Sequence, residues 1–86
     1  MKALENQKYE EAIAHFTKAL AADPSDYFSH FHLALASSAI LRDDVAIEHY
    51  RKAIQLAPNE DFYYLWLGRA LLEKAKGSQA AQAQRQ

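Results

Sequence analysis

The chain has 86 residues, of which half are hydrophobic, 24% are charged, and only two are glycine and two are proline. This length accommodates one small domain, and the apolar content excludes a disordered or collagen-like chain. The formal net charge of −1 gives no basic surface for nucleic acid, whose phosphates are bound by clustered lysine and arginine.

Membrane insertion, secretion and thiol chemistry are not predicted either. No apolar run approaches the roughly 20 residues that cross a bilayer, and the first residues contain no apolar signal core. The sequence has no cysteine, which excludes disulfides, thiolate metal sites and thiol nucleophiles. A chain without cysteine suits a reducing compartment, so we predict a cytoplasmic protein that binds neither membranes nor nucleic acid.

Hydrophobic periodicity predicts an all-α chain. The expected elements are a short helical start at residues 2–6 and helices near residues 8–22, 26–40, 43–57 and 60–75. Pro24 and Pro58 follow two of these helices, because proline does not fit a helix interior, and Asp26 can cap the next helix. Short connections make successive helices antiparallel neighbours. The polar tail, residues 77–86, is predicted to be disordered or a weakly helical cap.

Two of the helices are copies of one another. The segment from Lys8 to Pro24 aligns without a gap with the segment from Arg42 to Pro58. Small and aromatic residues recur at matching places, which are Ala12 and Ala46, Phe16 and Tyr50, and Ala19 and Ala53. This constant offset is a period of about 34 residues, which is typical of a helical repeat protein built from helix pairs.

The period and these residue types resemble the tetratricopeptide repeat family, whose second helix carries Ala, an aromatic residue, Ala and a final Pro. The pattern of the family's first helix is matched well at Tyr64, Leu67, Gly68 and Leu71. It is matched less well at His30, Leu33, Ala34 and Ser37. The resemblance implies antiparallel hairpins stacked as a short right-handed α-solenoid over residues 1–76. Its parts are a partial repeat (1–24), a full repeat (25–58) and the first helix of a third repeat (59–76).

The resemblance also implies a function, because the family binds peptides or partner proteins in a concave groove. The first helices carry a second apolar face that hairpin packing does not use, and large exposed apolar patches are uncommon on monomers. We therefore predict a protein–protein interaction module with a groove for apolar or aromatic anchors. Its predicted residues are Phe28, Phe31, His32, Leu35, Phe62, Leu65, Trp66 and Arg69. The alternative that the tail or a second copy of the chain covers this face stays open.

One subfamily holds the acidic tails of heat-shock chaperones with a clamp of lysine, asparagine and arginine. At the corresponding places this chain has His32, Phe62 and Trp66, and the helix that would supply the other two clamp residues is missing. We therefore expect an apolar or aromatic ligand instead of an acidic tail.

Self-association is the second predicted function, because the repeats are open at both ends. Apolar surface left in water costs roughly 25 cal/mol per Å², and the first and last helices each lack a hairpin partner. We expect a symmetric homodimer or a larger assembly. The residues predicted for it are Ala12, Phe16, Ala19, Leu67 and Leu71.

No catalytic site, metal site or cofactor is predicted. No two histidines have the i, i+4 spacing of a helical zinc site. We interpret His15 and His49 as surface residues and His30 as a tolerated polar substitution. Ser37, Ser38, Asp43 and Asp44 are assigned to packing or helix capping, since a nucleophile also needs a base and an orienting group.

Overall fold

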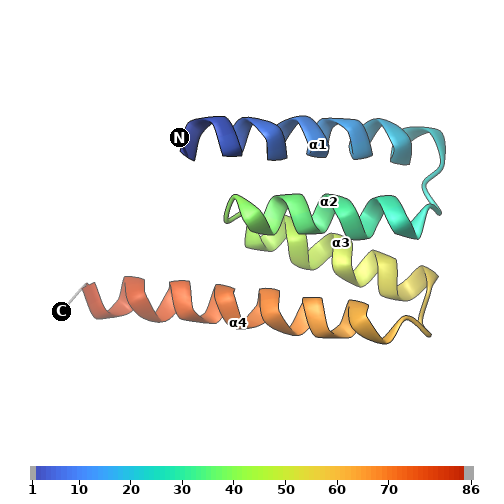
Figure 1. Ribbon diagram of the computed structural model, residues 1–86. Coiled ribbons are helices and arrows are strands. Elements are labelled where there is room, and N and C mark those ends of the chain that lie inside the picture. Colours follow the sequence, from blue (N-terminus) through green and yellow to red (C-terminus); the bar gives the residue numbers. More distant parts are fainter. Residues whose placement is uncertain (1, 85–86) are drawn as a thin grey trace.

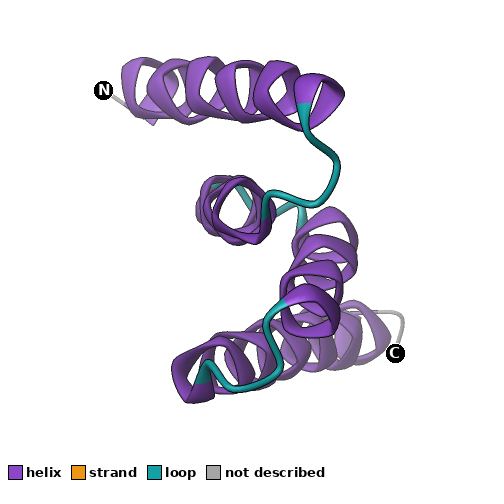
Figure 2. Cartoon of the chain, turned by 90° about the vertical axis from the view of Figure 1, so that its right-hand side faces the viewer, coloured by secondary structure: helices purple, strands orange, loops and turns teal. Residues whose placement is uncertain are grey.

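The computed structural model describes the backbone of residues 2–84 and the side chains of residues 6–77. The described chain forms four helices, which are α1 (Lys2–Ala22), α2 (Tyr27–Ala39), α3 (Asp43–Leu56) and α4 (Asp61–Gln84). Each helix runs antiparallel to the one before it and packs against it, and the helices follow an arc (Figures 1 and 2). The predicted all-α solenoid of antiparallel hairpins is confirmed.

Two kinds of turn connect the helices. At the start of α2, the Asp26 carboxylate accepts a hydrogen bond from the Ser29 backbone N–H at 3.2 Å, as expected for a helix cap. At the end of α2, Leu41 adopts a φ of 64°, and the next backbone N–H, from Arg42, donates to the Ser37 carbonyl at 2.9 Å. This bond ends α2 and lets α3 fold back along it.

The first and last helices are longer than the sequence predicts. Residues 2–6 and 8–22 belong to one helix, and α4 continues past residue 75 through Gly77 to Gln84. Residues 40–42 form the α2–α3 turn, and the repeat places residues 6–8 and 74–76 at equivalent positions. These equivalent residues are helical and form no turn. Residues 85–86 of the polar tail lie outside the described part.

The physical reason lies in the residues at and after these positions. Asp43 and Asp44 directly follow the α2–α3 turn, and these acidic residues favour the start of a new helix. Lys74, Ala75 and Lys76 are strong helix formers, and the sequence after them offers glycine instead of an acidic cap. The roughly 1 kcal/mol that a glycine costs inside a helix does not stop α4 at Gly77.

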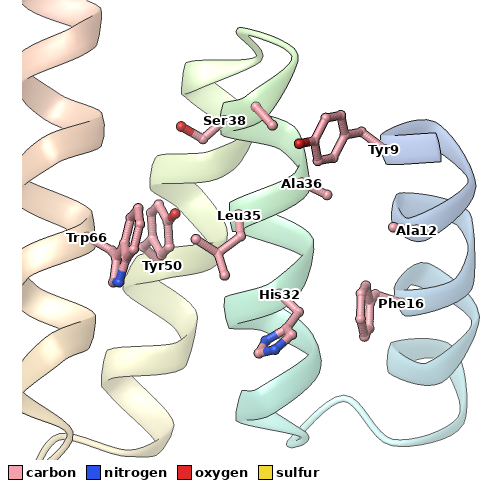
Figure 3. Close-up of a pocket in the computed structure, with 10 residues that line it drawn as sticks. Tyr9, Ala12, Phe16, His32, Leu35, Ala36, Ser38, Tyr50 and Trp66 are labelled. Carbon is pink, nitrogen blue, oxygen red and sulfur yellow. The ribbon is translucent and has the colours of Figure 1, made fainter. Parts of the chain in front are cut away.

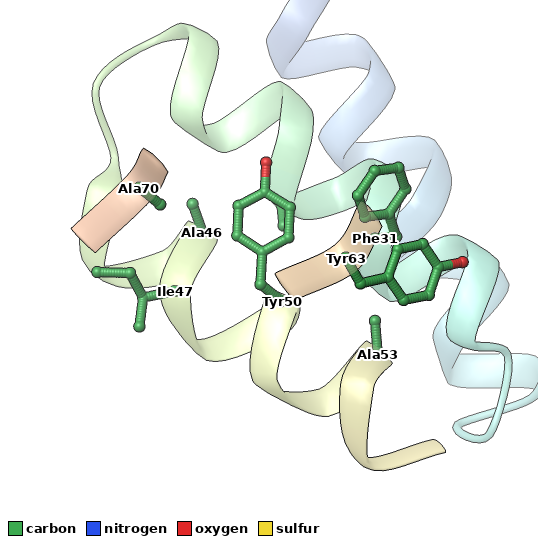
Figure 4. Close-up of a cluster of buried hydrophobic side chains, with 8 residues drawn as sticks. Phe31, Ala46, Ile47, Tyr50, Ala53, Tyr63 and Ala70 are labelled. Atoms are coloured by element: carbon green, nitrogen blue, oxygen red, sulfur yellow. The ribbon is translucent and has the colours of Figure 1, made fainter. Parts of the chain in front are cut away.

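The hydrophobic core lies where α2, α3 and α4 meet (Figure 4). Tyr50 of α3 is fully buried at its centre, and alanines on the same helix allow the neighbouring helices to approach closely. The core consists of Phe31, Ala34, Ala46, Ile47, Tyr50, Ala53, Tyr63 and Ala70.

Candidate peptide-binding groove

A groove of about 440 Å³ lies on one side of α2, between α1 and α4 (Figure 3). Trp66 of α4 and Phe16 of α1 stand on its opposite sides, and Leu35 of α2 lies between them. The complete lining is Tyr9, Ala12, Phe16, His32, Leu35, Ala36, Ser38, Ala39, Tyr50 and Trp66. Three helices besides α2 therefore contribute to the groove.

The structure brings three of the eight predicted groove residues together in this lining, namely His32, Leu35 and Trp66. Phe28 and Phe62 are exposed and lie outside the lining. The Phe28 ring stacks on His32, which lines the groove, with ring centroids 4.0 Å apart. Leu65 is also exposed and lies outside the lining.

Arg69 borders a second, smaller hollow of about 180 Å³ that shares Trp66 with the main groove. Its guanidinium carbon lies 4.9 Å from the centroid of the Trp66 ring, within the range of a cation–π contact. Arg69 therefore contacts the tryptophan at the edge of the groove.

Phe31 requires a correction, because it lies in the core and not on a solvent-facing surface. Only 4% of it is exposed. Its ring stacks on Tyr63 at a centroid distance of 4.5 Å and meets the edge of Phe62 at 5.3 Å. The helical pattern placed Phe31 on the inner face correctly, but α4 crosses this part of the face and covers it.

Several groove residues were missing from the predicted groove set. The prediction used only helices that resemble the first helix of a repeat (first-type helices). In contrast, α1 resembles the second helix of a repeat (a second-type helix), and it contributes Tyr9, Ala12 and Phe16. Ala12 and Phe16 belong, with Ala19, to the residues that the sequence predicts for self-association, and all three are half-buried. Leu67, also in that set, is half-buried and Leu71 is exposed. The apolar stripe on α1 was the signal that could have extended the groove.

The floor of the groove contains two polar groups without hydrogen-bond partners among the described residues, the Tyr50 hydroxyl and His32 Nδ1. Burial raises the pKa of Tyr50 to about 12 and lowers the pKa of His32 below 6.5, since both effects disfavour the charged form. The lining contains no lysine, arginine, aspartate or glutamate. The groove is thus an uncharged, mainly apolar surface.

Among the described residues, no group of three or more His, Cys, Asp or Glu side chains is placed to hold a metal ion. No helix in this part of the chain combines the length and apolar character needed to cross a membrane.

Comparison with known proteins identifies the architecture. The sequence pattern described as the tetratricopeptide repeat matches residues 3–26 and 29–60. The chain belongs to the tetratricopeptide repeat family. Members of this family are typically interaction modules without catalysis, and the chain is a protein–protein interaction module.

The tetratricopeptide chain is also similar to a curated protein of Fusarium oxysporum f. sp. lycopersici, the tetratricopeptide repeat and J domain-containing co-chaperone DNJ1. The two sequences are 36% identical over 74 residues, which are 86% of this chain and 14% of the relative. The chain therefore spans only a small part of that relative.

The tetratricopeptide hairpin of α2 and α3 also contains a histidine pair that sequence reasoning did not find. His30 Nε2 lies 3.0 Å from the Pro24 carbonyl oxygen, and His30 Nδ1 lies 3.0 Å from His49 Nδ1. A carbonyl only accepts, so Nε2 of His30 donates to it. The Nδ1 of a neutral His30 then accepts from Nδ1–H of His49.

The interpretation of His30 as a merely tolerated residue is therefore wrong. At the matching place of the next repeat, the Tyr64 hydroxyl donates to the Pro58 carbonyl at 3.1 Å. Both side chains fasten a helix to the loop before it, and aligning His30 with Tyr64 was the available signal.

We predict that acid destabilises the fold through His49. Burial, followed by the nearby His30, lowers its pKa below the ordinary value of 6.5. Below about pH 6.5, His49 binds a proton in the unfolded chain but not in the folded chain. The contribution of His49 to stability is therefore complete above that pH and falls as the pH drops towards the lower folded pKa. Urea unfolding at low micromolar concentration between pH 8 and pH 5 measures this loss.

His49→Gln should make the pH dependence shallower, because an amide does not titrate in this range and can still donate to His30. The contribution of His32, whose pKa is also lowered by burial, should remain. His15→Gln, at the matching and exposed position of α1, is the control and should keep the wild-type pH dependence. Equal slopes for His49→Gln and wild type would contradict the role of the pair.

Proposed function

We propose that the groove binds an apolar, amphipathic helical segment of a partner protein. The observation that carries the proposal is the uncharged groove of about 440 Å³ with Trp66 and Phe16 on its sides. Ligand sites commonly have volumes of roughly 300–1,000 Å³ with apolar and aromatic linings, and an amphipathic helix in an apolar groove is a recurrent recognition mode.

A helix suits this place because α1 and α2 bound it as neighbouring helices of one arc. The side of α1 that carries Ala12 and Phe16 is only half-buried, which leaves room for a further helix. The co-chaperone description of the Fusarium relative supports a polypeptide ligand. The proposed compartment is the cytoplasm, on the grounds of the cysteine-free composition.

Trp66 provides a direct test, because it is the only tryptophan in the chain and it borders the groove. The probe is a tryptophan-free helical peptide selected against the protein from a display library of amphipathic helices. Its binding should shift and quench the Trp66 emission. Raising the salt concentration should change the affinity little, since no charged side chain lines the groove.

Trp66→Ala should weaken binding of the labelled peptide by about 30-fold or more, the effect typical of a central aromatic anchor. Because Trp66 also packs on the core, Ala39→Arg is a second variant that places a charge in the groove at an exposed position. Gln55→Arg on α3 is exposed and outside the lining, so it should bind like wild type. Wild-type affinity in both groove variants would refute the proposal.

A further inference from the structure

We propose that α4 of one copy of the chain docks on α1 of a second copy, head to tail. The two helices would form a hairpin between two molecules, equivalent to the hairpin that α2 and α3 form within one molecule. This inference goes beyond the proposed function, although the docking surface shares Ala12 and Phe16 with the groove.

The first observation is that α4 resembles the first helix of a repeat, and no described helix packs against it in the way that α3 packs against α2. In α2, the face that α3 covers is buried, and it consists of His30, Leu33, Ala34 and Ser37. The same face of α4, one repeat later, has Tyr64 and Leu71 exposed and Leu67 half-buried. A Cβ added to Gly68, the counterpart of Ala34, would meet nothing within 4 Å. The described residues therefore provide no helix of the α3 type to cover this face.

The second observation is the opposite deficit on α1. In α3, Ala46, Tyr50 and Ala53 are fully buried, because α2 packs on one side and α4 on the other. Their counterparts on α1 are only half-buried, since α2 is the one described helix that packs extensively against α1. No described helix of the first type covers this side of α1, so α4 of another copy is the type of helix that fits there.

The internal hairpin sets the register of this contact. In the internal hairpin, His30 contacts His49. One repeat after His30 is Tyr64, and one repeat before His49 is His15, so Tyr64 of one copy should contact His15 of the next. The small residues Ala34 and Ala46 become Gly68 and Ala12. Their small side chains allow the two helices the close approach that α2 and α3 have.

The same mapping accounts for two exposed apolar side chains, one on α4 and one on α2. Phe31 packs against Phe62 and Tyr63 of the following helix. Moved by one period, this contact places Leu65 of one copy against Phe28 and Ser29 of the next. Leu65 is 63% exposed and Phe28 is 54% exposed within one chain, and docking would bury them against each other.

The lengths of the terminal helices agree with this arrangement. The start of α1 and the end of α4 both project beyond the α2–α3 turn, at the same end of the molecule (Figure 1). In a hairpin formed between two copies these projections would run antiparallel and side by side. The extra turns of helix therefore lengthen the pairing and do not obstruct it.

The resulting interface joins different surfaces of the two copies, and it differs from the symmetric homodimer that the sequence suggested. Each copy keeps a free α4 at one end and a free α1 at the other. Head-to-tail contacts of this kind continue unless the rotation closes a ring. We therefore expect the mean mass in sedimentation to rise with concentration beyond that of a dimer.

Gly68 gives the matched pair of variants. Gly68→Arg places a long cation on the docking face at a position where an added Cβ meets nothing within 4 Å, and circular dichroism should show an unchanged fold. It should weaken self-association by about 30-fold or more. Gly68→Ala introduces the residue that the buried Ala34 already provides in the internal hairpin, so it should associate like wild type. Equal association of wild type and Gly68→Arg would overturn the proposal.

Cross-linking tests the head-to-tail orientation in a chain that has no native cysteine. Gly68→Cys and Ala12→Cys proteins are mixed and treated with a short bismaleimide. We expect products that contain one chain of each kind, and little product from either protein alone. Efficient cross-linking of Gly68→Cys to itself would indicate a symmetric α4–α4 contact and overturn the proposal.

These results are separable from those for the proposed function. A monomeric wild-type mass at high micromolar concentration, with peptide binding intact, would reject the inference and leave the peptide groove standing. Because the docked α4 would cover Ala12 and Phe16, peptide binding is judged in the non-associating Gly68→Arg protein, and absence of binding there would reject the peptide ligand instead. Gly68→Arg, whose own groove is unchanged, should still bind the selected peptide.

Discussion

Replacing Phe31 with alanine should destabilise the fold by about 3–5 kcal/mol, the usual cost of removing a buried phenylalanine side chain. Phe31 is packed between Tyr50, Phe62 and Tyr63, so the deletion leaves a cavity that three aromatic rings cannot easily fill. Because small domains are stable by only about 5–15 kcal/mol, we expect a large fall in the urea midpoint.

The repeat supplies the matched control for this experiment. Leu65 occupies the same position in the next repeat, but 63% of it is exposed. Leu65→Ala should change the stability by no more than about 0.5 kcal/mol, as is usual for surface substitutions, when it is measured on dilute protein. A small effect of Phe31→Ala, comparable with that of Leu65→Ala, would contradict the burial of Phe31.

The second large effect is expected from Ala46→Leu. Ala46 is fully buried in the α3 stripe that packs against the neighbouring helices. A larger side chain there forces the helices apart or into strained rotamers, at a cost of about 1–3 kcal/mol. Thermal unfolding followed by circular dichroism measures the difference.

Ala12→Leu is the comparison, since Ala12 has the same repeat position on α1 but is only half-buried beside the groove. The added side chain can extend into the groove, so we expect little loss of stability in dilute solution and weaker peptide binding. Equal destabilisation by the two leucine substitutions would show that α1 is as tightly enclosed as α3.

The sequence predicted the features that depend on local pattern. The repeat period predicted which helices are alike, and the positions of Pro24 and Pro58 predicted where two helices end. These signals succeed because proline geometry and the helical period act within a few residues of the chain.

The features that were not predicted depend on which helix lies next to which. Phe31 and Leu65 share a repeat position but differ in burial, because α4 covers the first and no described helix covers the second. The groove extends onto α1 for the same reason. The His30–His49 contact joins residues 19 positions apart, and helical periodicity alone does not indicate such a pair.

The fastening of His30 to the carbonyl of Pro24 has a consequence for protein engineering. Pro58 offers an equivalent carbonyl to the residue that follows it by six positions. Residues 25–58 therefore form a repeat unit that ends with a proline carbonyl, and the first helix of a following copy of the unit would use this carbonyl as its hydrogen-bond acceptor. An array made by joining copies of this unit would contain one histidine pair in every unit. The loss of fold stability at acidic pH would therefore increase with the number of units.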